Sequence, residues 1–136
     1  QVGDVKAIDL FHGYTYSAHP IAAAALITTL DVYTEDNLFE RTNDLASYWE
    51  DALHSLKGTS HVIDIRNLGL VAGIEMSPRE GSPGTRGYDV FTDGFHNHNL
   101  LLRITGDTLA LSPPLIVEKD HIDQIVETLR VIIPNH

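Results

Sequence analysis

The alternation of hydrophobic and polar positions along the chain predicts a helix close to its beginning. After Pro20 the sequence is rich in Ala and Leu, and we expect a buried helix from about residue 20 to residue 33. Proline suits the first turn of a helix, and His19 stands near the cap. The small residues Ala22 to Ala25 would let another backbone approach this helix closely.

A second, amphipathic helix is predicted directly after the first. Thr34 offers a cap, and Glu35 and Asp36 suit the positive end of a helix. Gly58 is expected to close it. The apolar positions fall on one stripe, which consists of Leu38, Leu45, Trp49, Ala52, Leu53 and Leu56.

Beyond the second helix the hydrophobic period changes to alternation, which predicts strands. Ile63 and Ile65 alternate with polar neighbours, and apolar residues recur at every second position over residues 68–76. We expect two strands joined near residues 66–67. The Pro- and Gly-rich stretch 77–87 is then predicted to be a surface loop.

Helix and strand periods return in the second half of the chain. Tyr88, Phe91 and Phe95 share a helical face, and this helix is expected to end at about residues 97–99, because Asn tolerates the left-handed conformation.

Two short strands, 100–104 and 108–111, are predicted around a turn at 105–107, and a last amphipathic helix opens at Glu118. The order ααββαββα predicts an α/β or α+β domain in which helices cover a small sheet.

Composition narrows the possible functions. A chain of 136 residues is the size of one domain, and a net charge of -10 with 9 Lys+Arg argues against nucleic-acid binding. Cysteine is absent, which excludes disulfides and thiolate metal sites. No apolar run reaches the roughly 18 residues of a membrane span. We therefore expect no membrane partner and a cytoplasmic protein.

Hydroxyl-bearing residues precede the first helix. Gly13, Tyr14 and Thr15 stand in the stretch FHGYTYSAHP, where the free N–H groups of a helix start and a hydroxyl favour an anion such as phosphate. The alternative is that these hydroxyls cap the helix and the tyrosines pack beside it.

Arg103 interrupts the otherwise apolar run LLLRI. A guanidinium held at the end of a strand can clamp a carboxylate with two parallel hydrogen bonds. The alternative is an edge-strand arginine that is solvated or paired with Asp107.

Other candidate chemistry is weaker. The only close histidine pair, His96 and His98, lacks a third ligand at recognisable spacing, so no metal is expected. Schiff-base chemistry needs a lysine that can be desolvated, and none of the candidates is placed for it: Lys6, Lys57 and Lys119.

Four blocks of the sequence resemble one enzyme family: FHGYTYSAHP, YWEDALHSLKG, VIDIRNLGLVAGIEM and LLLRITGDTLALSPPLIVEKDHIDQIVETL. They resemble the C-terminal part of class III (subgroup II) pyridoxal-phosphate aminotransferases, closest to the ω-amino acid:pyruvate, or β-alanine:pyruvate, transaminases. The resemblance implies the C-terminal domain of fold-type I enzymes. It places a lead-in from the large domain at residues 1–19 and the small domain at 20–136.

The resemblance also implies roles for individual residues. Thr15, with Gly13 and Tyr14, would bind the phosphate of pyridoxal 5'-phosphate in the neighbouring subunit, and Arg103 would bind the substrate carboxylate. The family's Schiff-base lysine lies upstream of GYTYSAHP, and Lys6 is too close to match it. No catalytic residue is therefore expected in this chain, which alone should be inactive.

The implied partners are the upstream large domain, a second subunit in a homodimer or higher homo-oligomer, an amino donor and an oxo acid. The alternative that stays open is a non-catalytic small α/β module that binds a partner or a small anion.

Overall fold

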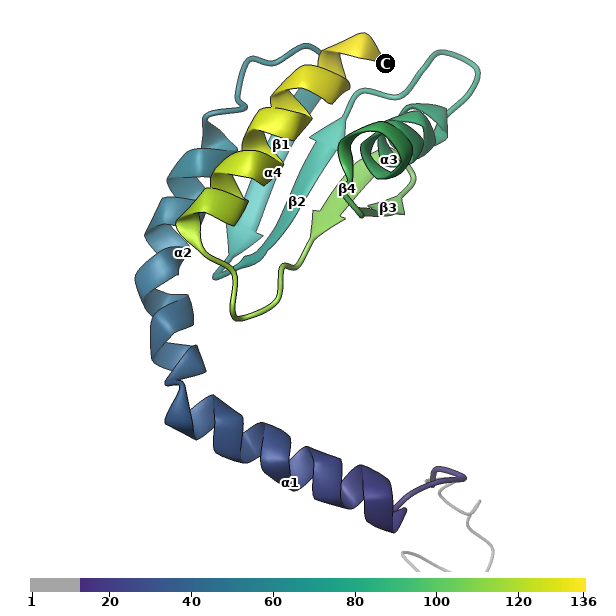
Figure 1. Cartoon of the computed structure of the whole chain (residues 1–136). Helices are drawn as coiled ribbons and strands as arrows, with labels where there is room; N and C mark the ends of the chain where they lie inside the picture. The colour runs from purple at the N-terminus through teal and green to yellow at the C-terminus, as the bar shows by residue number, and fades with distance from the viewer. Residues whose placement is uncertain (1–12) are drawn as a thin grey trace, which may run out of the picture. The chain divides into compact units, whose positions relative to one another are not determined.

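A computed structural model describes residues 13–136 and divides the chain into two compact units, Gln1–Asp36 and Asn37–His136 (Figure 1). The expected order ααββαββα is confirmed, with a 3-10 turn, Ile133–Asn135, added at the end. The predicted domain boundary between residues 19 and 20 stays a prediction.

The helix of the first unit, α1, spans Pro20–Glu35. The expectation that it is buried is wrong for the described residues, because none of its side chains is buried. Its apolar residues surround the helix instead of forming one stripe, so that no single face of α1 is marked for a core. The hydroxyls of Thr28, Thr29 and Thr34 donate to carbonyls one turn back.

The second unit begins with α2, Leu38–His54. Its cap is Asn37 in the left-handed conformation, with φ 48, and not Thr34, whose hydroxyl donates to Leu30 in α1. The helix ends at His54, before Gly58. The predicted stripe is confirmed by the buried side chains of Leu38, Leu45, Trp49, Leu53 and Leu56.

The sheet contains four antiparallel strands among the described residues, in the order β1-β2-β4-β3. Their bounds are β1 Val62–Leu68, β2 Val71–Met76, β3 Arg103–Thr105 and β4 Thr108–Leu111.

The first hairpin turns at residues 69–70, and the expected turn at 66–67 is wrong. Arg66 and Asn67 are paired in register with Gly73 and Ala72. The actual turn uses Gly69, whose φ of +55 favours glycine.

Three helices, α2, α3 (Thr85–His98) and α4 (Lys119–Ile132), lie over one face of the sheet (Figure 1). Alternation along each strand sends Ile65, Ile74 and Leu109 into the core beneath them. Within the described part of the second unit, the opposite face of the sheet carries no helix. We call this the bare face, and it includes Arg66, Gly73, Ala110 and Arg103.

Helix α3 differs from its sequence-based expectation in two ways. It begins at Thr85, inside the predicted loop 77–87, and Tyr88 and Phe95 are 59% and 49% exposed. The face that packs inward carries Gly87, Val90 and Gly94, a pattern that a search for large apolar residues does not detect. The expected helix end is confirmed, because Asn99 caps the helix with φ 54.

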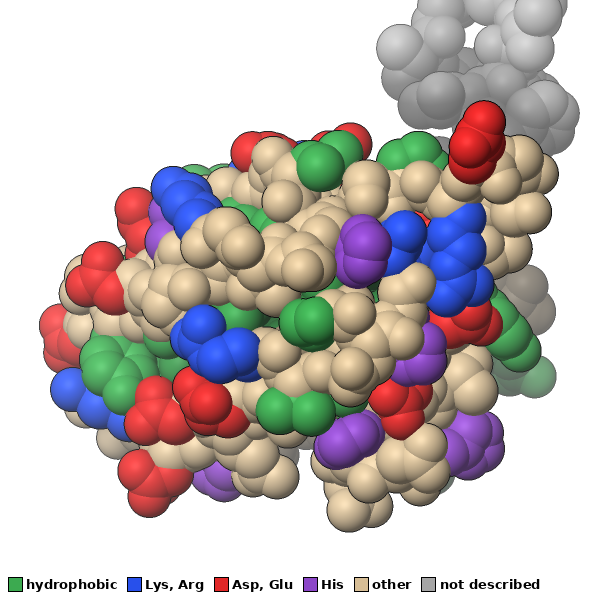
Figure 2. Space-filling model, turned by 90° about the horizontal axis from the view of Figure 1, so that it is seen from above, with side chains coloured by type: hydrophobic (Ala, Val, Ile, Leu, Met, Phe, Trp, Pro, Cys, Tyr) green, Lys and Arg blue, Asp and Glu red, His purple; other side chains and the backbone are tan. Residues whose placement is uncertain are grey.

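The last helix, α4, opens as expected after Glu118. The Glu118 side chain accepts from the helix backbone, and the main-chain N–H of Glu118 donates to Nδ1 of His121 over 3.2 Å. No helix formed by residues 13–136 combines the length and apolarity that crossing a membrane requires. On the face seen in Figure 2, hydrophobic side chains are separated by charged and histidine side chains.

Candidate functional site

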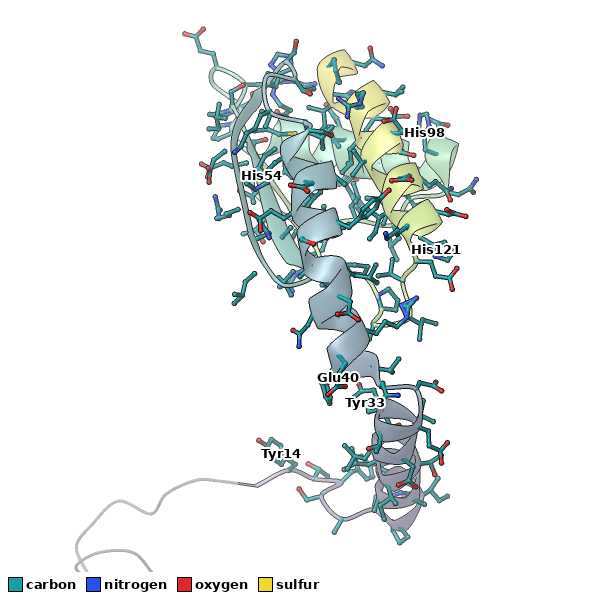
Figure 3. The ribbon with its side chains drawn as sticks, turned by 90° about the vertical axis from the view of Figure 1, so that its left-hand side faces the viewer. Tyr14, Tyr33, Glu40, His54, His98 and His121 are labelled. Atoms are coloured by element: carbon teal, nitrogen blue, oxygen red, sulfur yellow. The ribbon has the colours of Figure 1, made fainter. Side chains whose placement is uncertain are left out.

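The segment before α1 is a pair of successive turns. The main-chain N–H of Ser17 donates to the carbonyl of Tyr14, and that of His19 donates to the carbonyl of Tyr16, each over 3.1 Å. Residues 13–15 are exposed on these turns, with Tyr14 labelled in Figure 3. Thr15 is therefore presented ahead of the helix and not at its cap.

The alternative that hydroxyls cap α1 is wrong. The cap residue is His19, and no side-chain hydrogen bond caps the helix. The hydroxyl of Thr15 has no hydrogen-bond partner among residues 13–136.

The same segment suits an anion electrostatically. No acidic residue stands between Gly13 and Leu30, and the first turn of α1 contains none. The exposed hydroxyl of Thr15, which has no hydrogen-bond partner among residues 13–136, precedes the start of α1 and suits a phosphate group as a donor.

Arg103 is the first residue of β3 and lies on the bare face opposite Ala110 in β4. Its side chain is exposed. The suggested pairing with Asp107 is not found, because the Asp107 carboxylate accepts hydrogen bonds from main-chain N–H groups at the start of α3 instead.

Among the residues that the structure describes, Arg103 differs from the other arginines in that its side chain has no partner. Each of the others has a hydrogen-bond or ion-pair partner: Arg41, Arg66, Arg79, Arg86 and Arg130. Arg103 has none among the described residues. Because its donors are unused, this guanidinium is available for a planar acceptor such as a carboxylate.

Small residues leave space beside Arg103. Ala110 pairs with Arg103 on one side and with Gly73 on the other, and Gly73 pairs with Arg66. A cavity of about 340 Å³ lies along residues 100–103 and 110–114, and Trp49 of α2 and Ile125 of α4 also line it. Arg103 therefore borders a cavity large enough for a small acid.

Arg66, at the other edge of this row, is already neutralised. Its Nη1 lies 2.8 Å from Asp64 and 2.9 Å from Glu75. The hydrogen bonds that Arg66 donates to these two carboxylates, Glu75 first, raise the pKa of Arg66. The two arginines of the bare face thus differ in whether their charge is paired.

The predicted site residues are distributed over both units. Thr15 belongs to the first unit and Arg103 to the second. Lys119 lies over the Tyr48 ring, 4.8 Å from its centroid, and Lys6 lies outside the described residues. His98 is 3.8 Å from Asp93, and no group of three potential metal ligands occurs within residues 13–136.

Sequence reasoning missed a second cavity, of about 380 Å³, between the end of α3, residues 113–117 and α4. His98 and His121 line it from the two helices (Figure 3). Periodicity gives no signal for such a cavity, because its walls come from segments that are distant in the sequence.

Comparison with solved structures shows where this fold occurs. The chain superimposes on a transaminase solved with L-alanine with a TM-score of 0.82 at 28% identity, covering 91% of this chain and 30% of that chain. It also matches adenosylmethionine-8-amino-7-oxononanoate aminotransferase from Methanocaldococcus jannaschii, with a TM-score of 0.81 at 26% identity, covering 93% of this chain and 30% of that one. The fold is that of a transaminase domain.

Residues 1–133 match the family described as aminotransferase class III. The chain belongs to this family, whose enzymes depend on pyridoxal phosphate. It is 60% identical over 126 residues to an omega-aminotransferase of Caulobacter vibrioides, covering 93% of this chain and 28% of the relative. It is 39% identical over 127 residues to a beta-alanine–pyruvate aminotransferase of Pseudomonas aeruginosa, covering 90% of this chain and 27% of the relative. The chain therefore spans just over a quarter of these relatives.

Proposed function

We propose that this chain is the C-terminal part of a pyridoxal-phosphate transaminase that moves an amino group from an ω-amino acid or amine to pyruvate. Family membership supports the reaction class, and the names of the two relatives support the substrates. The structural observation that carries the proposal is Arg103, an exposed guanidinium without a partner among the described residues, beside space for a small acid.

Arg103 binds and orients the carboxylate shared by the oxo acid and by an amino-acid donor. Two parallel N–H donors of the guanidinium match the two oxygens of a carboxylate, which fixes both the position and the plane of the substrate. An amine donor without a carboxylate does not use this contact. Arg103 therefore distinguishes the two kinds of substrate.

The cofactor's phosphate is proposed to bind at Thr15, with Gly13 and Tyr14 forming the turn that presents it. The hydroxyl of Thr15, unpartnered among the described residues, donates to the phosphate. Pyridoxal phosphate, when bound, supplies the electron sink of the reaction. In this proposal the site is shared between subunits of a homodimer, and the Schiff-base lysine lies in an upstream large domain, so the chain alone is inactive.

The test of Arg103 compares substrates in the full-length enzyme. Arg103→Ala should raise KM for pyruvate by about tenfold or more, because hydrogen bonds between charged groups are lost. KM for an amine that lacks a carboxylate should change little. Arg66→Ala is the matched control, since the charge of Arg66 is already paired on the same face. Equal losses for both substrates would show that Arg103 is structural.

The test of Thr15 measures cofactor binding without turnover. Thr15→Ala in the full-length enzyme should speed the dissociation of pyridoxal phosphate, followed by its absorbance during dialysis. Ser17→Ala is the control, because it removes a nearby hydroxyl from the same turns. If both variants release the cofactor at the wild-type rate, Thr15 does not hold the phosphate.

A further inference from the structure

The segment that carries Arg103 is held at both of its ends by helix α3. We propose that the α3 glycine face, Gly87 and Gly94, together with Asp107, sets the position of Arg103 and is therefore required for carboxylate recognition. This inference rests on the proposed function, because it takes Arg103 to be the carboxylate-binding residue. Gly87, Gly94 and Asp107 are positioning residues, since they act through Arg103 and touch no substrate themselves.

The first point of attachment is between Gly87 and the turn that follows β3. A side-chain carbon added at Gly87 would lie 2.2 Å from the carbonyl oxygen of Gly106. Such a distance is far inside van der Waals contact, so only glycine lets the turn lie this close to the helix. The position of Gly106 is thereby tied to the backbone of α3.

The second point of attachment lies seven residues along the same helix, at Gly94. Residues seven apart share a face of an α-helix, separated by about 10 Å along its axis. The N–H of Leu100 donates to the carbonyl of Gly94 over 2.8 Å. A carbon added at Gly94 would lie 3.1 Å from the Leu100 carbonyl oxygen, which is tight but accommodated by a small shift.

Asp107 fastens the turn to the start of α3. One carboxylate oxygen accepts from the N–H of Gly84 over 2.6 Å, and the other accepts from the N–H of Gly87 over 2.9 Å. Free N–H groups and the positive end of the helix dipole make this a favourable place for a carboxylate. The main-chain oxygen of Asp107 also accepts from the N–H of Met76 over 2.9 Å.

Arg103 stands midway between these attachments, three residues after Leu100 and three before Gly106. Strand β3 contains only 3 residues and, within the part of the chain that the structure describes, pairs with β4 alone at the edge of the sheet. An edge strand this short has few ladder hydrogen bonds to resist a displacement. A shift of the turn is therefore carried along β3 to the guanidinium, and shifts of about 1 Å are enough to impair catalysis.

The experiment uses the full-length enzyme with Asp107→Asn, Gly87→Ala and Gly94→Ala. In Asp107→Asn one side-chain oxygen still accepts a hydrogen bond, but the other oxygen is replaced by an NH2 group, which cannot accept from the second N–H. We expect KM for pyruvate to rise about 3- to 30-fold in Asp107→Asn and Gly87→Ala, and less in Gly94→Ala. KM for a carboxylate-free amine should stay within twofold of the wild-type value.

Matched controls separate positioning from general damage. Glu80→Gln removes an exposed carboxylate, and His96→Ala changes an exposed residue of α3; neither should alter either KM. If Gly87→Ala does not fold, Asp107→Asn still tests the proposal. Hydrogen exchange over residues 100–107 gives a second readout, and faster exchange is expected in both variants.

The outcomes distinguish this inference from the proposed function. If Arg103→Ala is selective for carboxylate substrates while Asp107→Asn and Gly87→Ala affect both substrates equally or not at all, the inference is overturned and the function stands. If Arg103→Ala itself lacks selectivity, the proposed function fails and the inference fails with it. Wild-type exchange over 100–107 in Asp107→Asn would also overturn the inference.

Discussion

The close approach at Gly87 makes a quantitative prediction about stability. In an exposed helix interior, Gly→Ala usually stabilises a protein by up to about 1 kcal/mol, because alanine loses less backbone entropy. At Gly87 the new carbon would lie 2.2 Å from the Gly106 oxygen, so that the turn must retreat by roughly 1 Å.

Two costs outweigh the gain in helix propensity. Overpacking of a rigid contact costs about 1–3 kcal/mol. Retreat of the turn also weakens the two hydrogen bonds that Asp107 accepts, and bonds to a charged group contribute about 1.5–3 kcal/mol each. We expect Gly87→Ala to destabilise the second unit by about 2–4 kcal/mol. Gly94→Ala, at 3.1 Å, should change stability by less than about 1 kcal/mol.

Equilibrium unfolding in urea measures both variants. The single tryptophan, Trp49, has a fully buried side chain in the core of the second unit and reports its unfolding through fluorescence. The urea midpoint of Gly87→Ala should lie clearly below that of Gly94→Ala, with the m-value unchanged. If Gly87→Ala is as stable as the parent chain, or as stable as Gly94→Ala, the contact with Gly106 does not constrain the fold and the argument from Gly87 is refuted.

Two further predictions concern acid and the core. The amide of Asn97 and the imidazole of His136 donate hydrogen bonds that hold the pKa of Asp93 below its ordinary value. This carboxylate therefore stabilises the fold above about pH 4, and the contribution is lost as the pH falls through its lowered pKa. The free energy of unfolding of Asp93→Asn should therefore fall less steeply below about pH 4 than that of the parent protein. Leu109 is fully buried in β4, so Leu109→Ala should lower the free energy of unfolding by about 2–5 kcal/mol. Leu68 is 86% exposed, so Leu68→Ala should change the free energy of unfolding by no more than about 0.5 kcal/mol. Equal losses of stability in urea unfolding would contradict the assignment of the core.

The order of the elements was predictable because hydrophobic periodicity is a strong local signal. The stripe of α2 and the alternation along β2 are confirmed for this reason, whereas Ile63 in β1 is 59% exposed, next to a shift in register between Val62 and Asp64. The turn between β1 and β2 was misplaced because Leu68 and Leu70 continue the alternating pattern, although one is exposed and the other buried. Gly69, which provides the positive φ, lies between them and marks the turn.

Helix α3 shows the limit of that reasoning. Of the predicted apolar face, Phe91 packs against the core, whereas Tyr88 and Phe95 are exposed. The contact face of α3 includes two glycines, which allow a close approach because they have no side chain. Which backbone will approach a glycine depends on the tertiary fold and not on the local pattern. The same limit explains the missed cavity at His98 and His121.

Arg103 is predictable from its chemistry, whereas the role of Thr15 follows from the family resemblance. An arginine within an apolar strand is visible in the sequence, but only the structure shows that Asp107 is engaged elsewhere and leaves Arg103 without a partner among the described residues. The role of Thr15 in phosphate binding stays a prediction. The structure adds that its hydroxyl does not cap α1.

The residues of β4 differ in how freely they can be mutated, because they alternate between the core and the bare face. Along β4, Leu109 and Leu111 are committed to the core, while Thr108 and Ala110 point to the side of Arg103. Combinatorial libraries restricted to Thr108, Ala110 and Thr105 would reshape the surroundings of the guanidinium at little thermodynamic risk. If Arg103 binds the substrate carboxylate as proposed, adaptation to new acids can proceed through every second residue of this hairpin.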